Sequence, residues 1–377
     1  TNLAKADDGG GAISFTGGTT WSTLMNQPTA QFYRVSVDDR YPYWLYGGQQ
    51  DNSSVAVPSA VVGPGIGNDD FHQAGGCESA HVAFDPANPR YLYGNCYNGI
   101  IGEYDRETKL ERNVMAYPFL GLAEPSDQMK YRWNWPSPII TSSHDRRVIY
   151  HGANLVFRSS DRGFTWAAIS PDLTRNDKAH QGPGGGPITN EGAGGEVYNT
   201  IHYLAESPHT AGVLWVGTDD GLVQLTRDGG TTWSNVTPKG LAESLINMIE
   251  VSPHDPATAY LAVSRHKWND NTPHVFRTTD FGASWTRLVD GLPSSEVVRV
   301  VREDPAQRGL LYAGTETGFW VSHDGGGAWQ RLQLNLPAVP ITDIRVHQGD
   351  LIIATEGRAF WILDDLSPLH QLSREVN

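Results

Sequence analysis

The sequence has few cysteines, no long apolar segment and fewer basic than acidic side chains. Only Cys77 and Cys96 are cysteines among the 377 residues. No run of 18 apolar residues occurs, so we expect no membrane insertion. Lysine and arginine number 28 against 42 acidic residues, which gives a net charge of −14. Because such a surface repels phosphate backbones and anionic lipid, we also expect no nucleic-acid partner.

Sequence motifs of several enzyme classes are missing too. The chain contains neither His-Glu-x-x-His nor Cys-x-x-Cys, which are spacings typical of metal sites. It also lacks the Gly-x-Ser-x-Gly elbow of many serine hydrolases. The sequence therefore predicts no metal site and no cofactor. The acidic pairs Asp69-Asp70, Asp219-Asp220 and Asp364-Asp365 could hold Ca²⁺, but we interpret them as solvated turn residues.

One eight-residue pattern, Ser/Thr-x-Asp-x-Gly-x-(Thr/Ser/Ala)-Trp, occurs four times. The copies span 159–166, 226–233, 278–285 and 322–329. A fifth copy at 14–21 has Thr16 at the position of the aspartate. Internal repetition at a period of about 40 to 50 residues indicates a propeller or a solenoid.

Each residue type in the pattern has a role in a tight turn. The carboxylate accepts hydrogen bonds from backbone N–H groups of its own turn. The glycine permits a positive φ, and the tryptophan ring packs over the turn as the next strand begins. The pattern therefore predicts a hairpin turn in which Asp161, Asp228, Asp280 and Asp324 are structural residues.

The segments between these turns read as antiparallel strands. The 41 glycines, 23 prolines, 12 tryptophans and 15 tyrosines favour a turn-rich all-β protein with a sizeable core. Each unit reads as an alternating apolar strand, a proline turn, a second strand, a glycine turn, a third strand, the repeated turn and a fourth strand. Four antiparallel strands form one propeller blade. Six units begin near Gln31, Ser79, Pro138, Tyr198, Ser244 and Val297.

The two ends of the chain supply further strands. Residues 341–365 read as three strands and residues 12–24 as one or two. We predict that both pieces form one composite blade that closes a seven-bladed propeller, a single domain over residues 1–377. Closure hides the sheet edges that an open ring would expose. Eight blades is the alternative, if the two pieces belong to separate blades.

The repeated turn resembles the Asp-box, or BNR repeat, of sialidases, sortilin-type receptors and xyloglucan-degrading glycosidases. Further stretches resemble secreted bacterial propellers of the sortilin-like or glycosyl-hydrolase-like type; they are 31–53, 131–138, 195–208, 302–318 and 350–371. The resemblance implies that the box joins the two outer strands of a blade, away from the ligand face, so its aspartates are not catalytic. It also implies an earlier propeller upstream in a longer protein, and a secreted or periplasmic location.

The first residues of the chain bear on the upstream portion, and the two cysteines bear on the compartment. The segment TNLAKADDGGG has no apolar core of a signal peptide and begins within a blade, so we expect a processed or partial chain. Residues 80–95 read as strand, turn and strand, which places Cys77 and Cys96 nearly opposite each other. They form either a cross-strand disulfide, which requires an oxidising compartment, or two buried thiols.

Polar and aromatic residues near the starts of the channel-facing strands are the candidate ligand contacts. These residues are Gln50, Asp51, Trp133, Trp135, Tyr198, Arg299 and Arg358. The two tryptophans either stack on sugar rings or pack beneath their own loop.

Glu78 and Glu196 are the best acidic pair, because each follows glycines that let the backbone approach a ligand. They act either as acid and base on a glycosidic bond or as acceptors for backbone N–H groups. No arginine motif of sialidases is present. The sequence thus predicts a recognition module for a polypeptide or glycan, with a glycosidase as the alternative.

Overall fold

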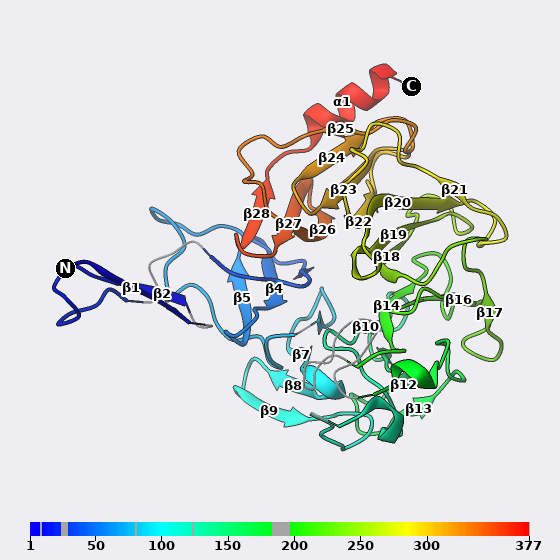
Figure 1. Cartoon of the computed structure of the whole chain (residues 1–377), viewed down its shortest axis with the longest axis horizontal. Helices are drawn as coiled ribbons and strands as arrows, with labels where there is room; N and C mark the ends of the chain where they lie inside the picture. Colours follow the sequence, from blue (N-terminus) through cyan, green and yellow to red (C-terminus); the bar gives the residue numbers. More distant parts are fainter. Residues whose placement is uncertain (8–9, 24–28, 80, 123, 183–196, 377) are drawn as a thin grey trace.

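The structure is a computed structural model of the chain, and it describes residues 1–7, 10–23, 29–79, 81–122, 124–182 and 197–376. Seven antiparallel sheets follow one another around a central channel, so the chain forms a seven-bladed β-propeller (Figure 1). The predicted fold is confirmed. Five blades have four strands, while the first and the last have three.

The strands of each blade are consecutive in sequence, and the first lies nearest the channel. The first two blades contain β3 (Ser36–Val37), β4 (Trp44–Gly48) and β5 (Ser54–Pro58), then β6 (Val82–Ala83), β7 (Tyr91–Asn95), β8 (Ile101–Asp105) and β9 (Leu110–Asn113). The third and fourth contain β10 (Ile139–Thr141), β11 (Ile149–Gly152), β12 (Val156–Ser159) and β13 (Ala167–Ala168), then β14 (Ile201–Glu206), β15 (Leu214–Thr218), β16 (Val223–Thr226) and β17 (Ser234–Asn235).

The second half of the ring repeats this order. The fifth and sixth blades contain β18 (Leu245–Val251), β19 (Ala259–Arg265), β20 (Asp270–Thr278) and β21 (Thr286–Arg287), then β22 (Val298–Glu303), β23 (Leu311–Thr315), β24 (Phe319–Ser322) and β25 (Gln330–Arg331). The last blade contains β26 (Ile341–His347), β27 (Asp350–Thr355) and β28 (Phe360–Leu363). Short 3₁₀ turns occur at Tyr97–Gly99, Ser126–Gln128, Lys178–His180 and His266–Trp268. Buried aliphatic and aromatic side chains fill the space between neighbouring sheets.

The predicted composite blade is wrong. Strand β2 (Gly10–Ser14) pairs only with β1 (Leu3–Asp7), in a hairpin that projects from the ring beside the first blade (Figure 1). The residues of β1 are all exposed, so the hairpin has little apolar surface to bury against the ring. Strands β26 to β28 form a three-stranded sheet without it.

A short extended segment before β3 joins the first and last blades instead. The Phe32 N–H donates to the Thr355 carbonyl at 3.0 Å, and the Gly357 N–H donates to the Ala30 carbonyl at 2.9 Å. The Phe32 ring stacks on Phe360 with centroids 3.7 Å apart. These contacts close the ring with side-chain packing and backbone hydrogen bonds.

The chain ends in one α-helix. Helix α1 (Ser367–Val376) docks beside the sixth blade, where Leu366 and Leu369 join the core and the His370 Nε2 atom lies 2.9 Å from an Asp304 carboxylate oxygen. Within the described residues, no helix has the length and apolar character that a bilayer span requires.

The four complete copies of the repeated pattern fold into the same turn between the third and fourth strands. Asp228 shows its geometry: one carboxylate oxygen accepts from the Thr232 N–H at 2.9 Å and the other from the Thr232 hydroxyl at 2.6 Å. The Thr226 hydroxyl accepts from the Gly230 N–H at 2.9 Å. Asp228 and Thr232 are exposed, while Thr226 is buried and Trp233 is half-buried.

Cys77 and Cys96 are joined by a disulfide in the second blade. Of the two alternatives left open by the sequence, the structure has the bridge. The Cys77 N–H also donates to the Asn95 carbonyl at 3.2 Å, so the segment before β6 is tied to the end of β7.

Candidate functional site

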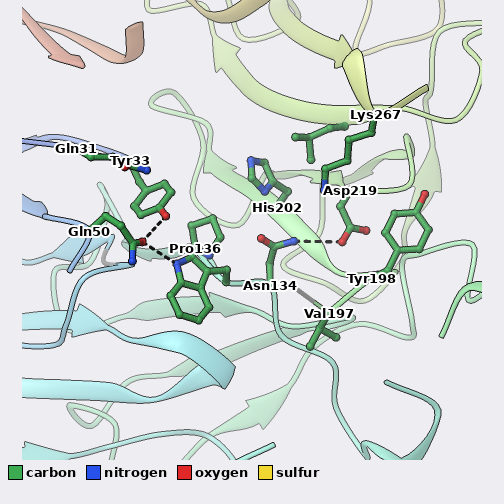
Figure 2. A pocket seen from close by; sticks show the side chains of 12 residues that line it. Gln31, Tyr33, Gln50, Asn134, Pro136, Val197, Tyr198, His202, Asp219 and Lys267 are labelled. Atoms are coloured by element: carbon green, nitrogen blue, oxygen red, sulfur yellow. Dashed lines mark hydrogen bonds between the residues drawn. The ribbon is translucent and has the colours of Figure 1, made fainter. Parts of the chain in front are cut away.

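One candidate site is a cavity of about 520 Å³ at the end of the channel where the first strands begin. Turns between second and third strands reach the same end, because neighbouring strands are antiparallel. Figure 2 shows how the side chains of several blades converge there. The cavity is lined by Gln31, Tyr33, Gln50, Asn134, Trp135, Pro136, Val197, Tyr198, His202, Asp219, Leu245 and Lys267.

One amide oxygen orients two aromatic rings in the cavity wall. Gln50 Oε1 accepts from the Tyr33 hydroxyl at 2.5 Å and from the Trp135 indole N–H at 3.3 Å (Figure 2). Trp135 also stacks on Tyr97, with centroids 5.1 Å apart and planes at 19°. Burial raises the pKa of Tyr33 to about 12, so the phenol stays a hydrogen-bond donor. The wall therefore offers rigid aromatic surfaces beside an amide.

The opposite wall contains a buried carboxylate. Asp219 accepts from the Thr200 N–H at 2.8 Å and from the Thr200 hydroxyl at 2.5 Å. It also accepts from the Asn134 amide at 3.2 Å (Figure 2). Its neighbour Asp220 accepts from the Asn199 amide at 2.7 Å. Burial, followed by the charge of Asp220, raises the pKa of Asp219. The pair therefore retains a proton to a higher pH than an ordinary aspartate does.

The interpretation of Asp219 and Asp220 as solvated turn residues was wrong. They are 6% and 0% exposed. The loops that carry Asn134 and Asn199 lie over the end of β15 and supply amide donors to both carboxylates. The sequence shows only an acidic pair in a turn. The burial could not be predicted because the loops that cover the pair belong to other parts of the chain.

Tyr198 is the other predicted contact that lines this cavity, besides Gln50 and Trp135. It is buried, and its hydroxyl donates to Glu243. Burial raises the pKa of this phenol, and the hydrogen bond to Glu243 raises it further. The ring edge therefore forms a fixed part of the wall.

The remaining predicted contacts lie elsewhere. Trp133 is buried and stacks on His151 with centroids 4.6 Å apart, beneath its own loop. Arg299 pairs with Glu316 and Glu356 and lines an adjoining cavity of about 140 Å³. Arg358 and Asp51 are exposed and line none of these cavities.

Only Glu78 of the predicted acid pair lies within the described residues. Glu78 is half-buried beside Gln50 and Asp51 and does not line the cavity. Burial raises the pKa of its carboxyl, and the charge of Asp51 adds to the effect. Glu196 lies outside the described residues, so the pair stays a prediction. Within the described ranges, no three His, Cys, Asp or Glu side chains gather as metal ligands would.

Sequence reasoning missed His202 and Lys267 as cavity residues. Burial holds the pKa of His202 well below its ordinary value, so the imidazole is neutral. Lys267 follows β19 as Gln50 follows β4 and Asp219 follows β15. Lys267 could have been identified from the sequence by this position, just after the second strand of its blade.

Comparison with known proteins identifies structures of similar fold but does not assign the chain to a family. The sequence matches no protein-family model and no curated protein. The structure is similar to the GH74 xyloglucanase from Xanthomonas campestris, with 16% identity and a TM-score of 0.64 over 92% of this chain and 54% of that one. It is also similar to YCF48 from Cyanidioschyzon merolae, with 10% identity and a TM-score of 0.59 over 90% of this chain and 97% of that one.

A third similar structure is the extracellular domain of a one-component system from B. thetaiotaomicron. It has 13% identity and a TM-score of 0.54, over 88% of this chain and 38% of that one. The chain thus spans about half the length of the xyloglucanase. At these identities the likeness shows a shared propeller fold.

Proposed function

We propose that this propeller is a recognition module that binds a polypeptide or a glycan at the mouth of its channel. The observation that carries the proposal is the cavity of about 520 Å³, to which amide, aromatic, acidic and basic side chains from several blades converge. Concave sites with a few fixed polar groups are typical of ligand-binding pockets.

The chemistry of the wall supports such a ligand. Gln31, Gln50 and Asn134 supply amide groups that both donate and accept, which suits peptide groups and sugar hydroxyls. Trp135 offers a ring held by Tyr97 and Gln50. A related fold has been solved as YCF48 with a D1 peptide, at 13% identity and a TM-score of 0.54, so propellers of this shape can take a polypeptide.

The test is a peptide array and a glycan array probed with the chain and two variants. Gln50→Ala removes the oxygen that orients Tyr33 and Trp135, and Lys267→Ala removes the cavity's cation. We expect each to weaken binding of the best ligand by about tenfold, or ~1.4 kcal/mol. Arg358→Ala is the matched control, because Arg358 is exposed and outside the cavity. Wild-type affinity in both cavity variants contradicts the proposal.

A glycosidase is the second candidate, favoured by the Asp219 and Asp220 pair. A carboxyl group that keeps its proton near neutral pH is the general acid that glycoside hydrolysis needs. The pair lies in the same wall as Asn134. Glu78 and Glu196 remain the acids predicted from sequence. Hydrolysis of a polysaccharide panel that is lost in Asp219→Asn, Glu78→Gln or Glu196→Gln favours the enzyme, whereas binding without turnover favours the recognition module.

We further infer that the chain works beside an upstream propeller in a secreted or periplasmic protein. The xyloglucanase that it resembles in fold is about twice as long, and the Cys77–Cys96 disulfide fits an oxidising compartment. Fractionation of the native cells, with thiol labelling of the two cysteines, tests this. Recovery of the protein from the cytoplasm with both thiols free contradicts it.

A further inference from the structure

A second cavity, of about 280 Å³, opens at the other end of the channel, where the first strands finish. Its lining combines cations with apolar side chains. Arg34, Arg345 and Arg146 supply the cations, and the apolar side chains include Val82, Phe84 and Ile140. None of these residues lines the cavity at the channel mouth, and Arg34 also lines the adjoining cavity of about 140 Å³.

Arg34 is a buried cation without a direct counter-ion. It is 8% exposed, and its guanidinium donates to the carbonyls of Asn247 at 2.8 Å and Thr342 at 3.1 Å. It lies 5.1 Å from the Tyr203 ring centre. In the described part of the chain it forms no ion pair with a carboxylate. A guanidinium stays protonated in proteins, and a buried unpaired charge is unfavourable until an anion approaches.

The carboxylate of Asp343, which lies in the same region as Arg34, already has other partners. One Asp343 oxygen lies 2.9 Å from Arg302, and the other accepts from the Val35 N–H at 3.2 Å. Arg345 reaches Asp343 only at 3.7 Å. Asp343 therefore cannot neutralise Arg34 and Arg345 together with Arg302, although Glu250 also pairs with Arg302.

Arg345 and Arg146 have N–H groups that are not used in hydrogen bonds to backbone carbonyls. Arg345 uses its Nε–H on the Val35 carbonyl, and Arg146 uses one N–H on the Ser142 carbonyl while its Nε atom lies 3.9 Å from an Asp85 carboxylate oxygen. Both side chains are more than a third exposed. Their remaining N–H groups can meet the two oxygens of a planar oxyanion, the geometry in which guanidinium binds carboxylate best.

We propose that this cavity binds a carboxylate that bears a short apolar group. Arg34 and Arg345 hold the carboxylate, and the apolar group packs on Val82, Phe84 and Ile140. The volume admits a small acid of this kind, and the apolar side chains gain from the removal of water. Selectivity for such acids over inorganic anions follows from the presence of both cationic and apolar groups in the lining.

The test titrates isovalerate, acetate and inorganic phosphate into the whole chain and follows binding by calorimetry. We expect isovalerate to bind most tightly. Arg345→Gln should weaken it by about tenfold, and Ile140→Thr should weaken isovalerate but not acetate. Arg147→Gln is the control, since Arg147 is exposed, bonds to Asp145 and does not line the cavity.

Three results overturn the proposal. One is the absence of binding for all three anions. In the second, Arg345→Gln binds isovalerate as tightly as the original chain does. In the third, phosphate binds as tightly as isovalerate, because the cavity would then select for charge alone. Circular dichroism of each variant confirms that it is folded, so that lost binding is not lost structure.

Discussion

The tryptophan that ends each repeated turn joins its blade to the preceding one. Its indole N–H donates to a backbone carbonyl there: Trp166 to Val114 at 2.8 Å, Trp233 to Ile169 at 3.1 Å, Trp285 to Val236 at 2.7 Å and Trp329 to Leu288 at 3.1 Å. The aspartate and glycine shape the turn, whereas the tryptophan fixes the spacing of the blades. In the decayed copy the Trp21 N–H bonds to Gly18 in its own turn at 3.1 Å.

Replacing the tryptophan of one turn tests this role. Trp329 is 3% exposed, so Trp329→Phe keeps most of the packing but leaves the Leu288 carbonyl without its partner. We expect a loss of about 1–3 kcal/mol in the free energy of unfolding, measured by chemical denaturation. Trp21→Phe is the control, because Trp21 is 41% exposed and bonds only within its turn. Equal losses in both variants contradict the inter-blade role.

Asp228 gives a prediction with a defined pH dependence. Hydrogen bonds from the Thr232 hydroxyl and N–H lower the pKa of Asp228 to about 2. Because the folded pKa lies below the ordinary value, the stabilisation is complete above that ordinary value and is lost as pH falls toward about 2. Asp228→Asn cannot accept from both Thr232 groups in the same way. We expect a lower melting temperature for the variant at neutral pH.

That difference in melting temperature should shrink as the pH falls from about 5 toward about 2, since the unfolded wild-type chain takes up a proton on Asp228 near the ordinary pKa, the folded one does so only near 2, and the asparagine does so in neither state. Thermal denaturation across this range measures it. A difference that stays constant with pH would mean that the carboxylate charge has no part in the turn.

Among the elements, the turns between first and second strands carry a second set of links. The Nε2 atoms of three histidines lie at hydrogen-bond distance from the carbonyl of the corresponding turn in the next blade: His144 to Ser207 at 2.8 Å, His209 to Ser252 at 2.9 Å and His254 to Asp304 at 2.8 Å. The blades are therefore joined near the channel and at the outer turns alike. Next to the hairpin β1–β2, the Trp21 indole N–H bonds within its own turn instead of to a neighbouring blade.

The hairpin should accordingly be the least stable element. Thr16 accepts from the Thr20 N–H at 2.9 Å with a hydroxyl, where Asp228 uses two carboxylate oxygens. We expect amides at 16–21 to exchange with solvent much faster than those at 228–233, because local opening is easiest where few buried contacts hold the backbone. Hydrogen exchange followed by mass spectrometry compares the two segments directly. Equal protection would refute the argument from the missing carboxylate.

Strands and turns were predicted best where a short stretch of sequence determines them. The strands within 341–365 were expected, and β26, β27 and β28 lie there. The repeated turns were also expected, because aspartate and glycine act within a few residues. The contact of Ala30 with Gly357 was not, since it joins segments from opposite ends of the chain. The burial of Asp219 depends on Asn134 and Thr200 in the same way.

For the whole molecule, ring closure is the feature on which stability depends. The first and last blades meet through Phe32 and Phe360 rather than through a shared sheet. An apolar cluster that includes Leu45 and Ile352, the aromatic stack and hydrogen bonds such as that from the Tyr43 hydroxyl to Asp350 together hold the junction. A propeller that opens there exposes sheet edges to solvent.

Phe32→Ala should therefore be strongly destabilising. Phe32 is buried, and replacement of a buried phenylalanine by alanine costs about 3–5 kcal/mol. Chemical denaturation provides the measurement. Phe15→Ala is the matched control, because Phe15 is 73% exposed in the projecting hairpin. A loss below about 1 kcal/mol for Phe32→Ala would show that the junction does not limit stability.

The recognition of a ligand at the channel mouth is the central claim for the molecule as a whole. The most direct measurement is hydrogen exchange of the chain with and without the best array ligand. We predict slower exchange at 131–136 and 198–203, the segments that carry Asn134, Trp135, Tyr198 and His202 into the cavity. Protection confined to the repeated turns at 228–233 or 280–285, with no change at the channel mouth, would contradict the account.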